Sequence, residues 1–196
     1  MAKQNYDDSE GRWVTIANRR VFIKNKQTLS DAMIESGIFH SQENKQIKDV
    51  KKQFIKDHKF ERKDITYEKG YKKRKHKDEM ACAVFIREQF GGEILCINED
   101  LEEGLSADYL WEGKLWELKT PKENTQNAIN KLFNKGLNQI KKNRGGLIFD
   151  LTKNDDFAVD QISKWMCEKI KKCNTEKVTV MFIKKSQVLE ILEIKK

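Results

Sequence analysis

The pattern of apolar and polar positions along this chain predicts a mixed α/β domain. Strand-like patterns, with alternating or continuous apolar residues, occupy segments 11–24, 93–97, 107–111, 114–120, 145–152, 177–184 and 188–194. Helical spacing of apolar residues occurs at 29–39, 47–55, 71–92, 124–143 and 155–173. From Lys69 onward the predicted order is therefore α-β-β-β-α-β-α, followed by closing strands.

These patterns divide the chain into three expected parts. Residues 1–40 form a small appendage of one hairpin, centred near Ala17-Asn18-Arg19, and one short helix. Residues 41–70 are polar and basic, and they predict a linker-like segment with a lone amphipathic helix. Residues 71–196 carry the main domain. No run of about 18 apolar residues occurs, so no membrane span is expected.

The net charge of the chain is concentrated in one segment. Segment 41–77 contains 14 Lys/Arg and 6 Asp/Glu residues, a surplus of 8, which equals the formal charge of +8 for all 196 residues. The densest part is "KGYKKRKHK" at 69–77, which makes Lys73, Arg74 and Lys75 candidate substrate contacts. A basic cluster beside a neutral domain is typical of proteins that bind polyanions. The alternative is a solvated helix face or linker.

The stretch "ADYLWEGKLWELKTPKE" (107–123) predicts a tight hairpin. With Glu112-Gly113 as the two turn residues, Asp108 lies opposite Glu117. Side chains alternate between the two faces of a strand, so Asp108, Glu117 and Lys119 share one face with two leucines. The other face, which we expect to pack in the core, carries Tyr109, Trp111, Trp116 and Leu118.

Two acids opposite each other have no structural purpose in a sheet, because like charges there are destabilising. A divalent cation bound between Asp108 and Glu117 would replace this repulsion with coordination, and Mg²⁺ prefers oxygen ligands. Lys119 could then orient or activate water or neutralise charge at a phosphate, which suits phosphodiester cleavage. The alternative is that these residues are merely the wet face of a hairpin, since Glu-x-Lys recurs at 61–63, 112–114 and 193–195. A one-residue slip of the hairpin would also separate the acids.

Four further residues are candidates for supporting roles. Glu79, at the start of the apolar stripe of helix 71–92, is a candidate additional metal ligand or else a surface acid paired with Lys75 or a neighbouring basic residue. His76 is a candidate catalytic or substrate-binding residue or else an exposed helix residue. Thr120 could bind phosphate or serve ordinary turn geometry. Gln139 could face the site and contact a phosphate or a base edge, or lie on a helix surface.

These residues carry a family resemblance. Glu79, Asp108, Glu117-Leu118-Lys119 and Gln139, in α-β-β-β-α-β order, resemble the PD-(D/E)XK nuclease superfamily. Within it, "HKDEMACAVFIREQFGGEI…SADYLWEGKLWELKTPKE…NKGLNQI" is similar to C-terminal nuclease domains of contact-dependent growth inhibition toxins, many of which cleave tRNA. The similarity covers roughly 71–194, with Ala107 where the superfamily name has Pro. The N-terminal "GRWVTIANRRVFIK…LSDAMIESG" is similar to the ends of some phage minor head proteins and mobile-element proteins.

The resemblance implies an αβββαβ nuclease core and a metal-dependent endonuclease, acting on tRNA or other RNA. It implies that Mg²⁺ or Mn²⁺ is held by Asp108, Glu117 and the main-chain carbonyl of Leu118. Lys119 would position the attacking water, and Glu79 would complete the site. A toxin of this kind would have an immunity protein, act in the bacterial cytoplasm and be delivered as part of a longer protein. The alternatives are a DNA nuclease from a phage or mobile element, and a non-catalytic nucleic-acid-binding or phage structural protein.

Overall fold

A computed structural model of the chain describes residues 11–16, 19–24, 46–98, 106–141, 143–153, 156–185 and 187–196. The chain divides into two compact units, Met1–Glu43 and Asn44–Lys196. In the first unit, β1 (Gly11–Ile16) pairs with β2 (Arg19–Lys24) in an antiparallel ladder that places Ile16 opposite Arg19. The predicted hairpin is therefore confirmed, whereas the helix predicted at 29–39 lies outside the described residues.

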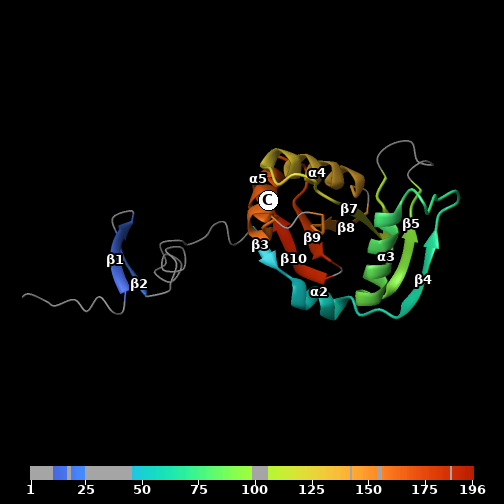
Figure 1. The fold of residues 1–196 in the computed structure, drawn as a ribbon, viewed down its shortest axis with the longest axis horizontal. Helices are drawn as coiled ribbons and strands as arrows, with labels where there is room; N and C mark the ends of the chain where they lie inside the picture. Colours follow the sequence, from blue (N-terminus) through green and yellow to red (C-terminus); the bar gives the residue numbers. More distant parts are fainter. Residues whose placement is uncertain are drawn as a thin grey trace, which may run out of the picture. The chain divides into compact units, whose positions relative to one another are not determined.

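The second unit is built on one mixed eight-stranded sheet (Figure 1). Its strand order is β3-β10-β9-β8-β7-β6-β5-β4. The β4/β5, β7/β8 and β8/β9 pairs are parallel, and the other four pairs are antiparallel. The strands are β3 (Ile47–Asp49), β4 (Arg62–Tyr67), β5 (Gly92–Cys96), β6 (Tyr109–Trp111), β7 (Lys114–Lys119), β8 (Arg144–Asp150), β9 (Lys177–Lys184) and β10 (Gln187–Lys195).

Four described helices accompany these strands, namely α2 (Lys51–Asp57), α3 (Lys77–Phe90), α4 (Gln126–Gln139) and α5 (Val159–Ile170). The expected mixed α/β class is confirmed, and the order α3-β5-β6-β7-α4-β8-α5 agrees with the hydrophobic pattern. None of these described helices is long and apolar enough to cross a membrane.

The segment expected to be a linker differs from the prediction. Residues 41–70 supply both edge strands of the sheet, since β3 pairs with β10 and β4 pairs with β5. The helix between them, α2, buries Phe54, whose ring lies 5.9 Å from the ring of Trp116. The second compact unit begins at Asn44, and its sheet and core include described residues that precede Tyr71.

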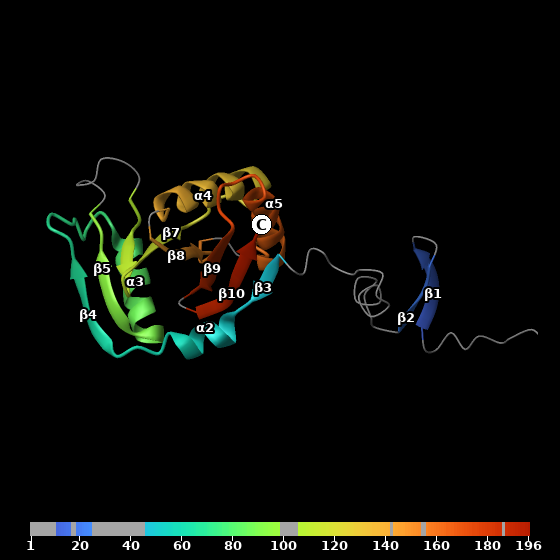
Figure 2. The ribbon, with the colours of Figure 1, turned by 180° about the vertical axis from the view of Figure 1, so that it is seen from behind.

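The helices cover both faces of the sheet and create two cores (Figure 1, Figure 2). Helices α4 and α5 pack on one face through Phe133, Ile129, Ile162 and Met166, against Leu147, Phe149 and Val180 of the strands. Helices α2 and α3 pack on the other face, against Tyr109, Trp111, Trp116, Leu118 and Ile148. Consecutive residues of β8 thus point into different cores, as expected of a strand buried on both sides.

Local chemistry explains where the two helices nearest the site begin and end. Helix α3 has Asp78 and Glu79 in its first turn, where acids interact favourably with the helix dipole. It ends at Gly91, whose φ of 71° favours glycine. Helix α4 begins after Thr125, whose side chain accepts a hydrogen bond from the Ala128 amide at 3.3 Å.

Candidate active site

The central hairpin has the predicted register. Glu112 and Gly113 adopt φ angles of 47° and 71°, as a two-residue turn with positive φ at both central positions requires. The observed pairs are Tyr109–Trp116, Leu110–Leu115 and Trp111–Lys114. The predicted core face is also confirmed, because Tyr109, Trp111, Trp116 and Leu118 all lie in the core beneath α2 and α3.

Asp108 and Glu117 lie next to each other and are nearly inaccessible to solvent, with exposed fractions of 4% and 1%. The Asp108 amide donates a hydrogen bond to Glu117 Oε2 at 3.1 Å. In return, Asp108 Oδ2 accepts a hydrogen bond from the Leu118 amide at 2.7 Å. Each carboxylate is therefore fixed by the backbone of the opposite strand, where β6 begins and β7 approaches its end.

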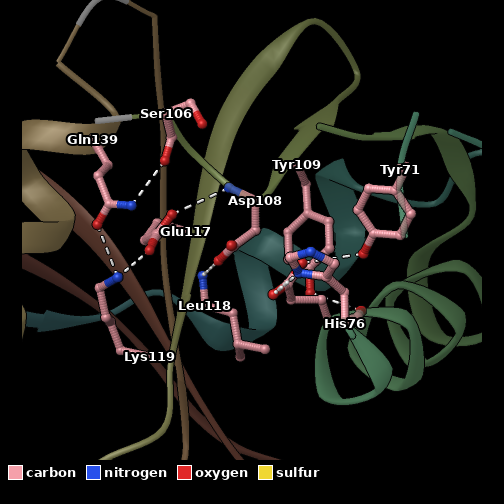
Figure 3. A network of polar contacts seen from close by, with 10 residues as sticks. Tyr71, His76, Ser106, Asp108, Tyr109, Glu117, Leu118, Lys119 and Gln139 are labelled. Carbon is pink, nitrogen blue, oxygen red and sulfur yellow. Dashed lines mark hydrogen bonds and ion pairs between the residues drawn. The ribbon is translucent and has the colours of Figure 1, made fainter. Parts of the chain in front are cut away.

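Lys119 completes this buried charged group. Its exposed fraction is 7%, and its ammonium forms an ion pair with Glu117 Oε1 and donates to Gln139 Oε1 at 2.8 Å (Figure 3). Gln139 Nε2 donates in turn to the main-chain oxygen of Ser106 at 2.8 Å. The face that could have been the wet side of a hairpin is thus covered by α4, and Gln139 of that helix faces the site.

A second polar group lies at the start of α3. Glu79 Oε1 is 2.7 Å from His76 Nδ1, and Glu79 Oε2 accepts a hydrogen bond from the Tyr71 hydroxyl at 3.1 Å. The hydroxyl of Tyr109 donates to the main-chain oxygen of Glu79 at 2.8 Å, which ties α3 to strand β6. His76 is buried, with an exposed fraction of 8%. Glu79 is therefore paired with His76 and Tyr71 at the edge of the buried charges.

Asp108 lies between the two groups (Figure 3). Gln139 and Lys119 are on one side of it, and Tyr71 and His76 are on the other. Burial raises the pKa of Asp108 well above its usual range, and the negative charges of Glu117 and then Glu79 raise it further. The hydrogen bond from the Leu118 amide and the charge of Lys119 oppose this rise. The carboxylates of Glu117 and Glu79 therefore concentrate negative charge around Asp108.

The other predicted substrate contacts lie at the rim. Lys73, Arg74 and Lys75 are exposed in the connection between β4 and α3. The ammonium of Lys73 lies 3.8 Å from the ring centre of Tyr67. Thr120 is half-buried and directly follows Lys119. None of the hydrogen bonds described above joins these four residues to the buried charges.

Sequence reasoning missed three residues that shape the site: Tyr71, Tyr109 as a hydroxyl donor, and Ser106. Tyr71 lies within the lysine-rich segment 69–77, but its contact with Glu79 depends on the path of the chain into α3. Tyr109 was expected only as a core residue. Ser106 carried no signal, because its main-chain oxygen makes the contact with Gln139.

The donor chemistry of the site fits a hard divalent cation. Asp108 and Glu117 supply oxygen ligands of the kind that Mg²⁺ and Mn²⁺ prefer, and a cation would offset the charge that raises the pKa of Asp108. Among the described residues, however, no group of three or more acidic, His or Cys side chains is placed so that it could hold a metal ion by itself. Two carboxylates, a main-chain carbonyl and oxygens from a substrate are the ligands that this site could offer.

The chain matches no protein-family model, no curated protein and no solved structure. The resemblance of residues 71–194 to PD-(D/E)XK nucleases therefore stays a prediction.

Proposed function

We propose that the protein is a metal-dependent endonuclease that hydrolyses phosphodiester bonds. The observation that carries this proposal is the burial of Asp108, Glu117 and Lys119 side by side, with exposed fractions of 4%, 1% and 7%. Burying charge is costly unless the groups are paired or bind an ion. Lys119 offsets only one of the two acids by direct pairing. The second carboxylate therefore lowers stability through its desolvation, and buried charges kept at such a cost are typical of active sites.

Each residue of the site has a separate role in the proposed hydrolysis. Asp108 and Glu117, with the main-chain carbonyl of Leu118, would hold Mg²⁺ or Mn²⁺, and Glu79 would complete the site from α3. The bound cation supplies positive charge to the phosphate and lowers the pKa of the water that attacks it. Lys119 is fixed by Glu117 and Gln139, so its ammonium can orient that water or stabilise the charge developing on the phosphate.

The basic connection before α3 supports a nucleic acid as the substrate. Lys73, Arg74 and Lys75 are exposed there, and they lead into His76 and Glu79 beside the buried acids. Cationic side chains at the rim attract the phosphate backbone without reading sequence. We favour RNA, with tRNA as the first substrate to test, because of the resemblance to toxin nuclease domains. The same resemblance motivates an immunity protein as partner, action in the bacterial cytoplasm and delivery within a longer protein.

Cleavage assays test this proposal directly. The full chain is incubated with total tRNA and with plasmid DNA in Mg²⁺, in Mn²⁺ and in EDTA, and the products are resolved on denaturing gels. We expect cleavage of RNA that EDTA abolishes and that Glu117→Gln abolishes. Glu61→Gln is the matched control, because Glu61 is an exposed residue directly before β4, in another Glu-x-Lys triplet, and its substitution leaves the site intact.

Each outcome of the cleavage assays distinguishes one alternative function or mechanism from the proposed one. Cleavage of plasmid but not tRNA identifies a DNA nuclease with the same metal chemistry. Cleavage that persists in EDTA contradicts the metal mechanism, and full activity of Glu117→Gln contradicts the assignment of the residues. If neither substrate is degraded with either metal, the result favours a non-catalytic nucleic-acid-binding or phage structural protein.

A further inference from the structure

A basic groove adjoins the candidate active site on the side of α4. The groove has a volume of about 450 Å³ and begins at Thr120, the residue that follows Lys119. It extends between the β7–α4 connection and the exposed side of the helix. Its lining consists mainly of exposed polar side chains, including Lys122, Glu123, Asn127, Lys131 and Lys135. Ala128 and Leu132 also line the groove, so its exposed lysines border a partly apolar surface beside the end of β7.

The groove carries a surplus of positive charge. Three lysines, Lys122, Lys131 and Lys135, line it against the single acid Glu123. Lys131 and Lys135 are one helical turn apart, so their Cβ atoms lie roughly 5–6 Å from each other on one side of α4. None of the three lysines belongs to an ion pair between described residues. Their ammonium groups can therefore contact neighbouring phosphates.

Helix α4 links this groove to the buried charges. The helix passes over Lys119, since a Cβ atom added to Gly136 would lie 3.5 Å from Lys119 Cε. Gln139 of the same helix hydrogen-bonds the Lys119 ammonium. Tyr71 and His76, which belong to the connection before α3, lie on the opposite side of Asp108 (Figure 3). The candidate site thus has basic residues on two sides.

We propose that the α4 groove binds the phosphodiester backbone of one substrate strand, on the side of the cleaved phosphate opposite to segment 69–77. This inference rests on the proposed nuclease function and adds the path of the substrate. Lys131 and Lys135 are the principal phosphate contacts, and Thr120 marks the point where the strand enters the site.

A second polar cavity of the described region does not fit this role. It has a volume of about 270 Å³ and contains Lys141, Arg144 and Lys172. Lys141 and Lys172 directly follow the C-terminal ends of α4 and α5, where cations offset the negative end of the helix dipole. The positive charge there has a structural purpose, which the lysines in the middle of α4 lack.

A salt titration of binding tests the proposal. Fluorescence anisotropy measures binding of the full chain, in EDTA, to a single-stranded oligonucleotide with 2′-O-methyl riboses, which is resistant to cleavage. For single strands, each lost phosphate contact reduces the steepness of log K against log[salt] by about 0.7. We expect Lys131→Ala/Lys135→Ala to weaken binding and to reduce the slope by about 1.4, which is two such contacts.

The matched control is Lys164→Ala/Lys171→Ala, which removes the same charge from two exposed lysines of α5 and its C-terminal end. We expect its slope to equal that of the wild type. An unchanged slope in Lys131→Ala/Lys135→Ala overturns the proposal, and so does an equal decrease in the control variant. Because this measurement requires no catalysis, a chain that cleaves nothing but shows the expected slopes contradicts the proposed function and leaves the groove assignment in place.

A second measurement tests which side of the cleaved bond contacts the α4 groove. In cleavage assays, we expect Lys131→Ala/Lys135→Ala to lower kcat/KM for long RNA. Oligonucleotides shortened progressively from either end of a mapped cleavage site locate the contacts. We expect the decrease in kcat/KM to disappear when nucleotides are removed on one side of the cleaved bond, and to persist when they are removed on the other side. An effect that is independent of both truncations contradicts the proposed path.

Discussion

Replacing Lys119 with methionine tests whether the buried charged residues depend on one another for the stability of the fold. Methionine keeps an unbranched side chain of similar length but removes the ammonium. Glu117, with an exposed fraction of 1%, then loses its ion-pair partner, and Gln139 Oε1 loses the donor that lies 2.8 Å away. Both losses occur beneath α4, where the burial of these groups limits how far water can replace the ammonium.

The expected magnitude follows from these two losses. Removing one partner of a buried ion pair costs about 3–5 kcal/mol, and leaving a buried acceptor unsatisfied costs about 1–3 kcal/mol. The two terms overlap, because the same ammonium serves both acceptors. We therefore expect Lys119→Met to lower the free energy of unfolding by about 3 kcal/mol, measured by urea denaturation in EDTA at neutral pH.

A double-mutant cycle with Glu117→Gln separates the ion pair from ordinary packing. Once Lys119 is methionine, neutralising Glu117 removes a buried charge that has lost the neighbouring ammonium, and it costs less than it does in the wild type. We expect an interaction energy of at least about 1 kcal/mol between the two substitutions. Two results would refute this reasoning: a Lys119→Met protein that is as stable as the wild type, or costs that simply add in the double variant.

Two other substitutions probe the site and the strands beneath it. Asp108→Asn, in EDTA, should raise the free energy of unfolding at neutral pH. The folded state raises the pKa of Asp108 through burial and then Glu117, so wild-type stability falls relative to Asp108→Asn as the pH rises above the usual Asp value of about 4. A stability difference that is constant with pH in urea titrations argues against this assignment. Gly146→Ala should cost about 1–3 kcal/mol through overpacking, because its Cβ would lie 2.6 Å from both the Thr179 carbonyl oxygen and the Trp116 ring; an unchanged melting temperature would contradict the close packing.

The hairpin was predictable because its determinants are local. A two-residue turn at Glu112-Gly113 fixes the pairing of every residue that follows, and the alternation of side chains then places Asp108, Glu117 and Lys119 on one face. The aromatic residues of the other face confirm the same register from the hydrophobic side. A short stretch of sequence therefore contained most of the geometry of the candidate site.

The surroundings of the hairpin were harder to predict because they depend on contacts between distant segments. The three-residue strand β3 is too short to show a period, and it is defined by pairing with β10 at the end of the chain. The contact of Tyr71 with Glu79 depends on the turns that precede α3. The contact of Gln139 with Ser106 joins a helix to the backbone of a connection before β6. Hydrophobic periodicity contains no information about these contacts.

Burial of both faces of the sheet changes the meaning of the polar side of the hairpin. On an exposed face, Asp108, Glu117 and Lys119 would be ordinary solvated residues worth little to stability. Beneath α4, the same residues are desolvated, and each depends on a specific partner. The covering helix is therefore what turns a common sequence pattern into a candidate active site.

Direct binding of Mn²⁺ tests the central claim that Asp108 and Glu117 together hold a divalent cation. Isothermal titration calorimetry compares the wild type, Asp108→Asn, Glu117→Gln and the exposed control Glu61→Gln, each with and without the cleavage-resistant oligonucleotide. The account predicts saturable binding to the wild type and to Glu61→Gln that is lost in both site variants. Equal binding by Asp108→Asn and the wild type, or no binding by the wild type even with the oligonucleotide, would contradict it.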